Sequence, residues 1–201
     1  MKIKIHNSTT GYNLAAKDYD KREAYLDSFE KDKLLPLLGD IRGMKILDVG
    51  AGTGRLATRL AKAGAIVTAV DVSEAMIERL KIKRLKNIET VIGDAEALPF
   101  ADASFDIVVA AFLIVHLKDP TRFFDEAYRV LKDGGIFVVT NINQKEPPEI
   151  KTKEGIIKIE SYYHRPEKVR EILEELAFGV EREVLVKEGE NWVNQIVVGR
   201  K

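Results

Sequence analysis

Short apolar runs alternate with amphipathic stretches along most of the chain. The apolar runs have the length and the flanking turn residues of buried strands, and the amphipathic stretches have the period of helices. Strands and helices in alternating order predict parallel pairing, with helices on both faces of one sheet. The predicted strands are 45–49, 66–70, 88–92, 105–111, 136–140, 180–187 and 192–199, and the predicted helices are 21–38, 54–63, 73–84, 119–132 and 166–177.

Local signals mark the ends of several predicted elements. Ser73 is typical of a helix N-cap, because its hydroxyl can accept from a backbone N–H of the first turn. Pro120 is tolerated where a helix begins. A short polar turn at 188–191 joins the last two strands into a hairpin, so at least one of them runs antiparallel to the rest. Residues 141–156 are rich in Lys, Glu and Pro, and we expect a surface loop or lid there.

The first predicted helix, 21–38, carries apolar residues at helical spacing. This spacing predicts that one face of the helix is buried. The residues that we expect to face inward are Tyr25, Phe29, Leu34, Leu37 and Leu38.

Composition narrows the class of protein. Apolar residues make up 45% of the 201 positions, which is enough for a core, and no apolar run approaches the length of a membrane span. Lysine plus arginine equals aspartate plus glutamate at 32 each, a balance that disfavours a DNA or RNA partner. The polar N-terminus lacks the apolar stretch of a signal peptide. We therefore expect a cytoplasmic protein with no membrane contact, and the oligomeric state stays open.

The strongest candidate for a binding site is the segment 48–54, which reads Asp-Val-Gly-Ala-Gly-Thr-Gly. It lies where a predicted strand passes into a helix, at the edge of an α/β sheet where ligands bind. Glycine lets a ligand approach the backbone closely. The dinucleotide fingerprint Gly-x-Gly-x-x-Gly would need a third glycine at Arg55. Asp48 would repel a pyrophosphate, but it suits a ligand that carries an ammonium and a sulfonium.

This segment resembles the first motif of the class I S-adenosylmethionine-dependent methyltransferases. The second strand ends in Asp71, about 20 residues past the glycine loop, where a carboxylate can accept from two ribose hydroxyls. The segments 93–100 and 104–112 resemble the adenine-binding and methionine-side segments of the same family. The four segments occur in order across about residues 40–140, and they resemble the small-molecule branch most closely.

The resemblance implies a Rossmann-like three-layer sandwich around a seven-stranded, mostly parallel sheet, with strand order 3-2-1-4-5-7-6 and strand 7 antiparallel. It also implies the cofactor S-adenosyl-L-methionine and no metal. The alternative interpretation of Asp71 is a helix cap, and that of Met76 is core packing. The residues implied to bind the cofactor are Tyr19, Asp48, Gly50, Ala51, Gly52, Gly54, Asp71, Val72, Met76, Asp94, Ala95 and Ala111.

We expect a single methyltransferase domain over residues 1–201, in four parts. Residues 1–40 form an N-terminal helical cap, 41–140 the cofactor-binding core, 141–165 an acceptor-side loop or lid, and 166–201 a C-terminal helix and hairpin. In the family the N-terminal stretch often folds over the cofactor, and Tyr12 and Tyr19 lie in it; core packing is their alternative role.

Methyl transfer from a sulfonium needs alignment of donor and acceptor, and a base only if the acceptor must lose a proton early. The candidate bases are His116 and His164. A structural hydrogen bond is the alternative for His116, and helix capping or a surface position is the alternative for His164. The sequence predicts methylation of an oxygen, nitrogen or carbon atom of a small-molecule acceptor.

Absent residues exclude some acceptors. The chain has no cysteine, which excludes cytosine C5 methylation through a thiolate and arsenic methylation. After the fourth strand it reads Ala-Ala-Phe-Leu at 110–113, where the amino-methylating members of the family carry an Asn-Pro-Pro-Tyr-like turn. Two other functions remain open, a cofactor-binding protein without turnover and an NAD-dependent oxidoreductase.

Overall fold

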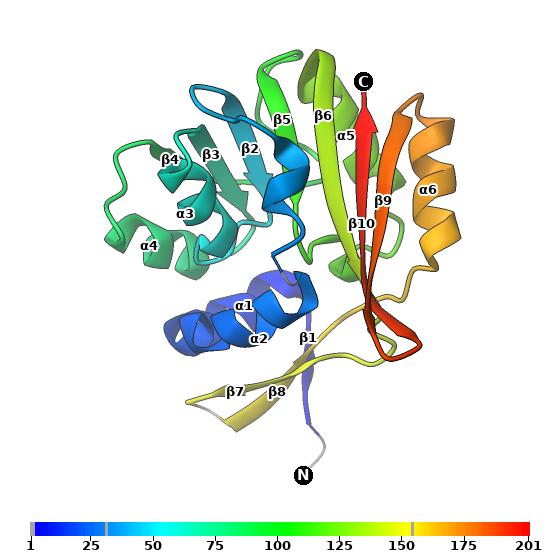
Figure 1. The fold of residues 1–201 in the computed structure, drawn as a ribbon. Coiled ribbons are helices and arrows are strands. Elements are labelled where there is room, and N and C mark those ends of the chain that lie inside the picture. The colour runs from blue at the N-terminus through cyan, green and yellow to red at the C-terminus, as the bar shows by residue number, and fades with distance from the viewer. Residues whose placement is uncertain (1–2, 31, 154) are drawn as a thin grey trace.

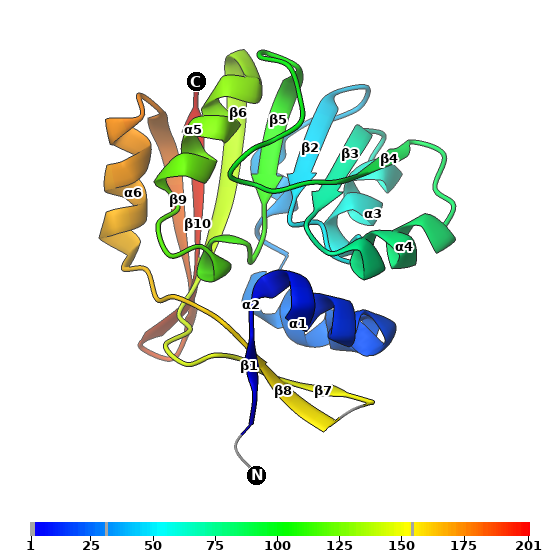
Figure 2. The same cartoon turned by 180° about the vertical axis from the view of Figure 1, so that it is seen from behind.

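The computed structural model describes residues 3–30, 32–153 and 155–201, and it contains a large and a small β-sheet (Figure 1). The helices α1 and α2 lie between the two sheets in both views (Figures 1 and 2). The strands of the large sheet are β2 (Lys45–Val49), β3 (Ile66–Asp71), β4 (Ile88–Ile92), β5 (Phe105–Ala110), β6 (Leu131–Ile142), β9 (Gly179–Glu188) and β10 (Asn191–Arg200). The helices that follow its strands are α3 (Arg55–Lys62), α4 (Glu74–Ile82), α5 (Thr121–Val130) and α6 (Pro166–Glu175), with the short 3₁₀ helix η3 at Ile114–His116.

The large sheet confirms the seven predicted strands and their order. Its strands lie side by side as β4-β3-β2-β5-β6-β10-β9. Counted along the chain within this sheet, that order is 3-2-1-4-5-7-6. The first five strands pair in parallel, and β10 is antiparallel to both β6 and β9. The N-cap prediction also holds, because Ser73 accepts a hydrogen bond from the Met76 N–H.

Both faces of the central strands β2, β3 and β5 are buried, which is why these strands are mostly apolar rather than alternating with polar residues. Successive residues of β5 enter different cores: Ile107 and Val109 pack with α3, whereas Val108 and Ala110 pack with α5 and α6. Helices α3 and α5 accordingly lie on opposite faces (Figures 1 and 2). The period of two along each strand therefore builds a three-layer sandwich.

The N-terminal part differs from the single helix predicted over 21–38. It contains four helical segments, of which the first three follow one another directly: α1 (Ser8–Ala15), η1 (Ala16–Arg22), α2 (Glu23–Glu30) and η2 (Leu35–Leu38). Asp32 adopts a left-handed backbone with φ 56°, which is incompatible with a continuous helix. Leu34 and Leu38 are buried as predicted, but Tyr25 is 55% exposed, so the predicted inward face was wrong at that position.

The expected loop at 141–156 also differs, because part of it forms a second sheet. Strand β7 (Glu149–Thr152) pairs with β8 (Gly155–Ile159), and β8 pairs in parallel with β1 (Ile5–His6). The inward residues Ile150, Ile157 and Ile159 form a core with Ala15. Gly11 permits this packing, because a Cβ there would lie 2.8 Å from the Ile159 side chain. The small sheet thereby holds α1 against the rest of the protein.

Among the described residues, no helix is both long and apolar enough to cross a membrane.

Candidate functional site

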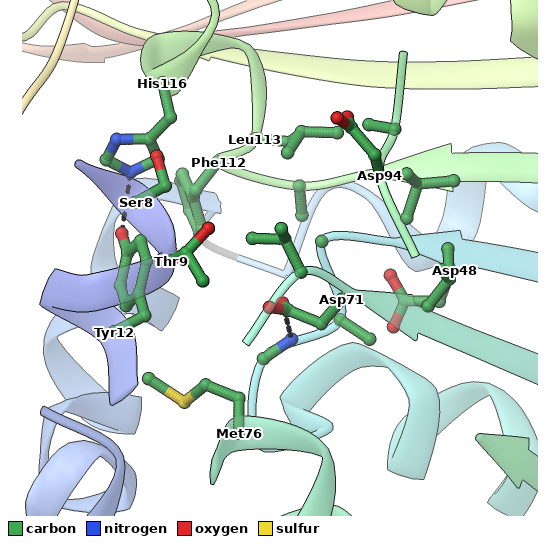
Figure 3. A pocket seen from close by; sticks show the side chains of 18 of the residues that line it. Ser8, Thr9, Tyr12, Asp48, Asp71, Met76, Asp94, Phe112, Leu113 and His116 are labelled. Atoms are coloured by element: carbon green, nitrogen blue, oxygen red, sulfur yellow. Dashed lines mark hydrogen bonds between the residues drawn. The ribbon is translucent and has the colours of Figure 1, made fainter. Parts of the chain in front are cut away.

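A cavity of about 320 Å³ opens at the carboxyl ends of β2, β3 and β5, with α1 and η1 on its other side (Figure 3). Its volume lies within the range of small-molecule sites. Most of the residues implied to bind the cofactor meet here. Those that line the cavity are Tyr19, Asp48, Gly50, Ala51, Gly52, Asp71, Val72, Met76, Asp94, Ala95 and Ala111.

The glycine loop between β2 and α3 follows a path that only glycine adopts without strain. Gly50, Gly52 and Gly54 have φ values of 72°, 56° and 87°. A Cβ at Gly52 would meet no atom within 4 Å, so the backbone here is open to a ligand. The Gly50 N–H donates to the carbonyl of Val70, which ties the loop to the end of β3.

Asp71 lies at the end of β3 and joins the glycine loop to the start of α4. Its Oδ2 accepts from the Gly52 N–H (Figure 3), and its Oδ1 accepts from the Ser73 N–H, both at 2.8 Å. Burial raises the pKa of the Asp71 carboxyl, against these backbone donors. Each carboxylate oxygen has more than one lone pair, so Asp71 can also accept from hydroxyl donors in the cavity.

Asp48 is the most deeply buried acid of the cavity. It is 2% exposed, and its Oδ2 has no hydrogen-bond partner among the described residues. Burial raises the pKa of Asp48 to about 7, although the nearby Arg55 charge lowers it in part. A buried carboxyl oxygen without a partner is costly, so the position favours a ligand that brings a donor or a positive charge.

We expect this raised pKa to make stability depend on pH. The unfolded carboxyl titrates near 3.9, so the folded state binds the proton more tightly. This contribution to stability is complete below about pH 4 and is lost as the pH rises to about 7. Between about pH 5 and pH 6, the free energy of unfolding should fall by about 1 kcal/mol relative to Asp48→Asn, as measured by urea unfolding of both proteins. Parallel pH curves for the two proteins would contradict the assignment.

The segment that follows β4 also lines the cavity. Asp94 accepts from the Glu96 N–H at 2.9 Å, and Ala95 is buried beside it. Met76 is 1% exposed and also lines the cavity, so its two interpretations, core and ligand contact, are compatible. Val72 is 37% exposed and presents an apolar surface at the rim.

His116 lies in the cavity in a fixed hydrogen-bonded chain. Its Nδ1 is 2.8 Å from the Glu160 carbonyl, which can only accept, so Nδ1 carries a proton. Desolvation lowers the pKa of His116, which favours the neutral ring. Nε2 is therefore an acceptor, and the Tyr12 hydroxyl donates to it at 2.6 Å (Figure 3). Burial raises the pKa of Tyr12 well above its usual value, so this hydroxyl keeps its proton.

Two of the predicted site residues are not among the described residues that line the cavity. His164 is buried, and its Nε2 lies 3.0 Å from the carbonyl of Ile114 and 2.9 Å from that of Leu117. These contacts tie the start of α6 to η3. Gly54 forms the left-handed turn immediately before α3.

Several cavity residues were missed by the sequence interpretation. Asn7, Ser8 and Thr9 line the cavity from the start of α1. Asn7 caps this helix by accepting from the Thr10 N–H at 2.9 Å, and an Asn before a helix is the signal that could have located it. Arg55 also lines the cavity, where it lies with its guanidinium 5.3 Å from the ring centroid of Phe112.

The charged residues of the cavity are not arranged as a metal site. Within residues 3–30, 32–153 and 155–201, no three His, Asp or Glu side chains are placed to hold a metal ion. The arrangement instead suits an elongated organic ligand, with hydroxyl donors at Asp71, a positive group at Asp48 and an apolar ring near Met76.

Comparisons with known proteins agree with this geometry. A methyltransferase domain family matches residues 47–139. The demethylmenaquinone methyltransferase of Tropheryma whipplei is 36% identical over 134 residues, 64% of this chain and 56% of that protein. The protein of the same name from Thermotoga maritima is 37% identical over 141 residues, 69% of this chain and 58% of that protein. The chain thus spans little more than half the length of these curated relatives.

Solved structures extend the similarity to most of the chain. A SAM-dependent methyltransferase from Aquifex aeolicus is 27% identical with a TM-score of 0.72, and the match covers 92% of this chain and 97% of that one. The shared domain lies on the part of the large sheet that carries the glycine loop. Residues 47–139 therefore match a methyltransferase domain family, and the chain has the fold of the class I S-adenosylmethionine-dependent methyltransferases.

Proposed function

We propose that this protein transfers the methyl group of S-adenosylmethionine to a small, largely apolar acceptor. The observation that carries the proposal is the pair of carboxylates at the ends of adjacent strands. Asp48 and Asp71 both line one cavity, and the glycine loop lies between them in the chain. Two carboxylates suit a ligand with a positive end and a neutral diol, and they disfavour a pyrophosphate.

The cavity residues fit S-adenosylmethionine group by group. Asp71 would accept from the ribose hydroxyls while its backbone contacts hold it in place. The unpartnered Oδ2 of Asp48 would face the cationic methionine part. Asp94 and Met76 would contact the adenine, the first through hydrogen bonds and the second through its apolar surface. Gly52 leaves room for the ligand to touch the loop.

The remaining wall of the cavity supports an apolar acceptor. Phe112, Leu113 and Leu117 line it after the end of β5, and Leu26 lines it from α2. The Tropheryma and Thermotoga relatives are named for methylation of a small molecule, which also supports this class of acceptor.

The bound cofactor supplies an electrophilic methyl carbon on its sulfonium. The residues of α1 and η1 cover the cavity, so they would exclude water and hold the acceptor in line. The Nε2 of His116 would accept a proton from the methyl acceptor, and the Tyr12 hydroxyl donates to this nitrogen in the structure. An acceptor hydroxyl could lose its proton to His116 through Tyr12, or directly after displacing Tyr12.

The first test is calorimetric titration with S-adenosylmethionine of the wild type and of Asp71→Asn. We expect the variant to bind about 1–3 kcal/mol more weakly, about 5- to 150-fold, because a charge-assisted contact with the ribose becomes a neutral one. Asp125→Asn is the matched control, since Asp125 is exposed on α5 and does not line the cavity.

Equal affinity of wild type and Asp71→Asn would contradict the site. Binding of NAD in place of S-adenosylmethionine would contradict the cofactor and favour the oxidoreductase interpretation. Incubation with cofactor carrying a labelled methyl group and a pool of small apolar acceptors then tests turnover. Tight cofactor binding without a labelled product would favour a binding protein.

A further inference from the structure

A second cleft of about 490 Å³ lies between η1 and the small sheet. It shares the wall residue Tyr19 with the main cavity, so it is the immediate neighbour of the proposed methyl-transfer site. On the other side the cleft is formed by β7, which is one of the two edge strands of the small sheet. The backbone groups on the outer side of an edge strand are not used by the sheet.

Positive charge dominates the wall of this cleft. Lys21 and Arg22 line it from η1, and Lys151 and Lys153 line it from the hairpin. Its carboxylates are Asp18 and Glu149.

Both carboxylates already have partners. Asp18 accepts from Lys21 at 2.6 Å, and Glu149 lies 3.4 Å from Lys158 on the neighbouring strand. No carboxylate of the described residues lies within ion-pair distance of Lys151, Lys153 or Arg22.

Two further observations favour an anion as the ligand of this cleft. The Nε of Arg22 is buried and has no hydrogen-bond partner among the described residues, while its Nη1 donates to the Glu149 carbonyl at 3.3 Å. The ammonium of Lys153 lowers the pKa of Lys17 on η1, which agrees with an excess of positive charge beside the cleft. Charges of one sign in a concave site attract counter-ions.

We propose that this cleft binds a phosphate or carboxylate group through Arg22, Lys151 and Lys153. Arg22 supplies a planar donor set and the two lysines supply compact charges, a combination that suits either anion. The group can belong to a soluble molecule or to the headgroup of an anionic phospholipid. An anion held here lies against the far side of Tyr19, so its molecule can approach the main cavity from the side of the small sheet.

The test uses the full chain without cofactor and inorganic phosphate as the probe. Backbone amide NMR shifts should saturate for residues of η1 and β7. In the double variant Lys151→Gln/Lys153→Gln the dissociation constant should rise about 25-fold, about fivefold for each lysine removed. Both lysines are exposed, so the variant should fold normally. Lys86→Gln, an exposed lysine that lines neither cleft, is the control and should bind phosphate like the wild type.

Vesicles distinguish the two sources of the anion. Co-sedimentation with phosphatidylcholine vesicles that contain phosphatidylglycerol, but not with pure phosphatidylcholine, would assign the cleft to a lipid headgroup, provided the double variant loses it. Saturable phosphate binding without vesicle binding would assign it to a soluble anion. Shifts that do not saturate, or that are unchanged in the double variant, would overturn the proposal. Titration of the double variant with S-adenosylmethionine tests the main cavity independently. Unchanged cofactor affinity together with lost anion binding would show that the two sites are separate.

Discussion

Replacing Arg55 with methionine is expected to lower the free energy of unfolding by about 3–5 kcal/mol, as measured by urea unfolding. The guanidinium of Arg55 donates from both Nη atoms to the Glu30 carboxylate, at 2.9 and 2.8 Å, and also to Asp27 at 2.8 Å. The side chains of Arg55 and Glu30 are only 10% and 5% exposed. Removal of Arg55 leaves the Glu30 charge buried without its partner, which is the costly case for an ion pair.

Two variants separate this cause from a general loss of charge. Arg42→Met removes a pair with Asp40 in which both side chains are exposed, and it should cost less than about 1 kcal/mol. Arg55→Met combined with Glu30→Leu removes both buried charges and should restore most of the stability. A double variant as unstable as Arg55→Met alone would show that the orphaned charge is not the cause. Because α2 and the glycine loop meet at this pair, we also expect Arg55→Met to weaken cofactor binding.

The substitution Gly54→Ala should lower the free energy of unfolding by about 2–5 kcal/mol, again measured by urea unfolding. Gly54 has φ 87°, where a side chain costs about 1–2 kcal/mol. A Cβ at Gly54 would also overlap the side chain of Leu80, which is 2% exposed and cannot easily move. Forcing extra volume into a packed core costs about 1–3 kcal/mol more.

Gly134→Ala is the matched control for the backbone contribution. Gly134 has φ 76°, and a Cβ there would meet nothing within 4 Å, so only the cost of about 1–2 kcal/mol remains. In a Leu80→Ala background, Gly54→Ala should cost no more than this control. If Gly54→Ala and Gly134→Ala were equally stable, the overlap with Leu80 would not contribute to the loss of stability in Gly54→Ala.

The strands of the large sheet could be predicted because their signals are local. Each buried strand is an apolar run that ends at polar or glycine residues. The hydrophobic period and the turn residues can both be recognised within a few positions of the sequence. The alternation with helices predicted the parallel pairing, and the resemblance supplied the strand order that the sheet adopts. The glycine loop and Asp71 were found in the same way, because a ligand-binding turn requires glycine and a nearby acid whatever the rest of the fold.

The small sheet could not be predicted, because its β7–β8 hairpin is stabilised by contacts with residues that are distant in the chain, in β1 and α1. Strand β1 has two residues, and it exists because Ile5 and His6 pair with Lys158 and Ile159 of β8. The helix over 21–38, by contrast, was predicted as one continuous element although the structure divides it. Apolar residues do recur there at helical spacing, but the left-handed backbone of Asp32 interrupts the helix. An aspartate in the sequence does not by itself predict a left-handed conformation.

The sequence by itself determined the doubly covered sheet, the cofactor type and most of the residues that we expected around the cavity, since local pattern and motif encode them. Tertiary structure alone decided what surrounds them. It placed the Tyr12 hydroxyl against His116, which is 104 positions away in the sequence. It also placed His164 against a backbone carbonyl outside the cavity and paired Arg55 with Glu30. Such contacts depend on which elements pack together, because a hydrogen bond or a buried ion pair forms only when packing places both partners within about 3 Å.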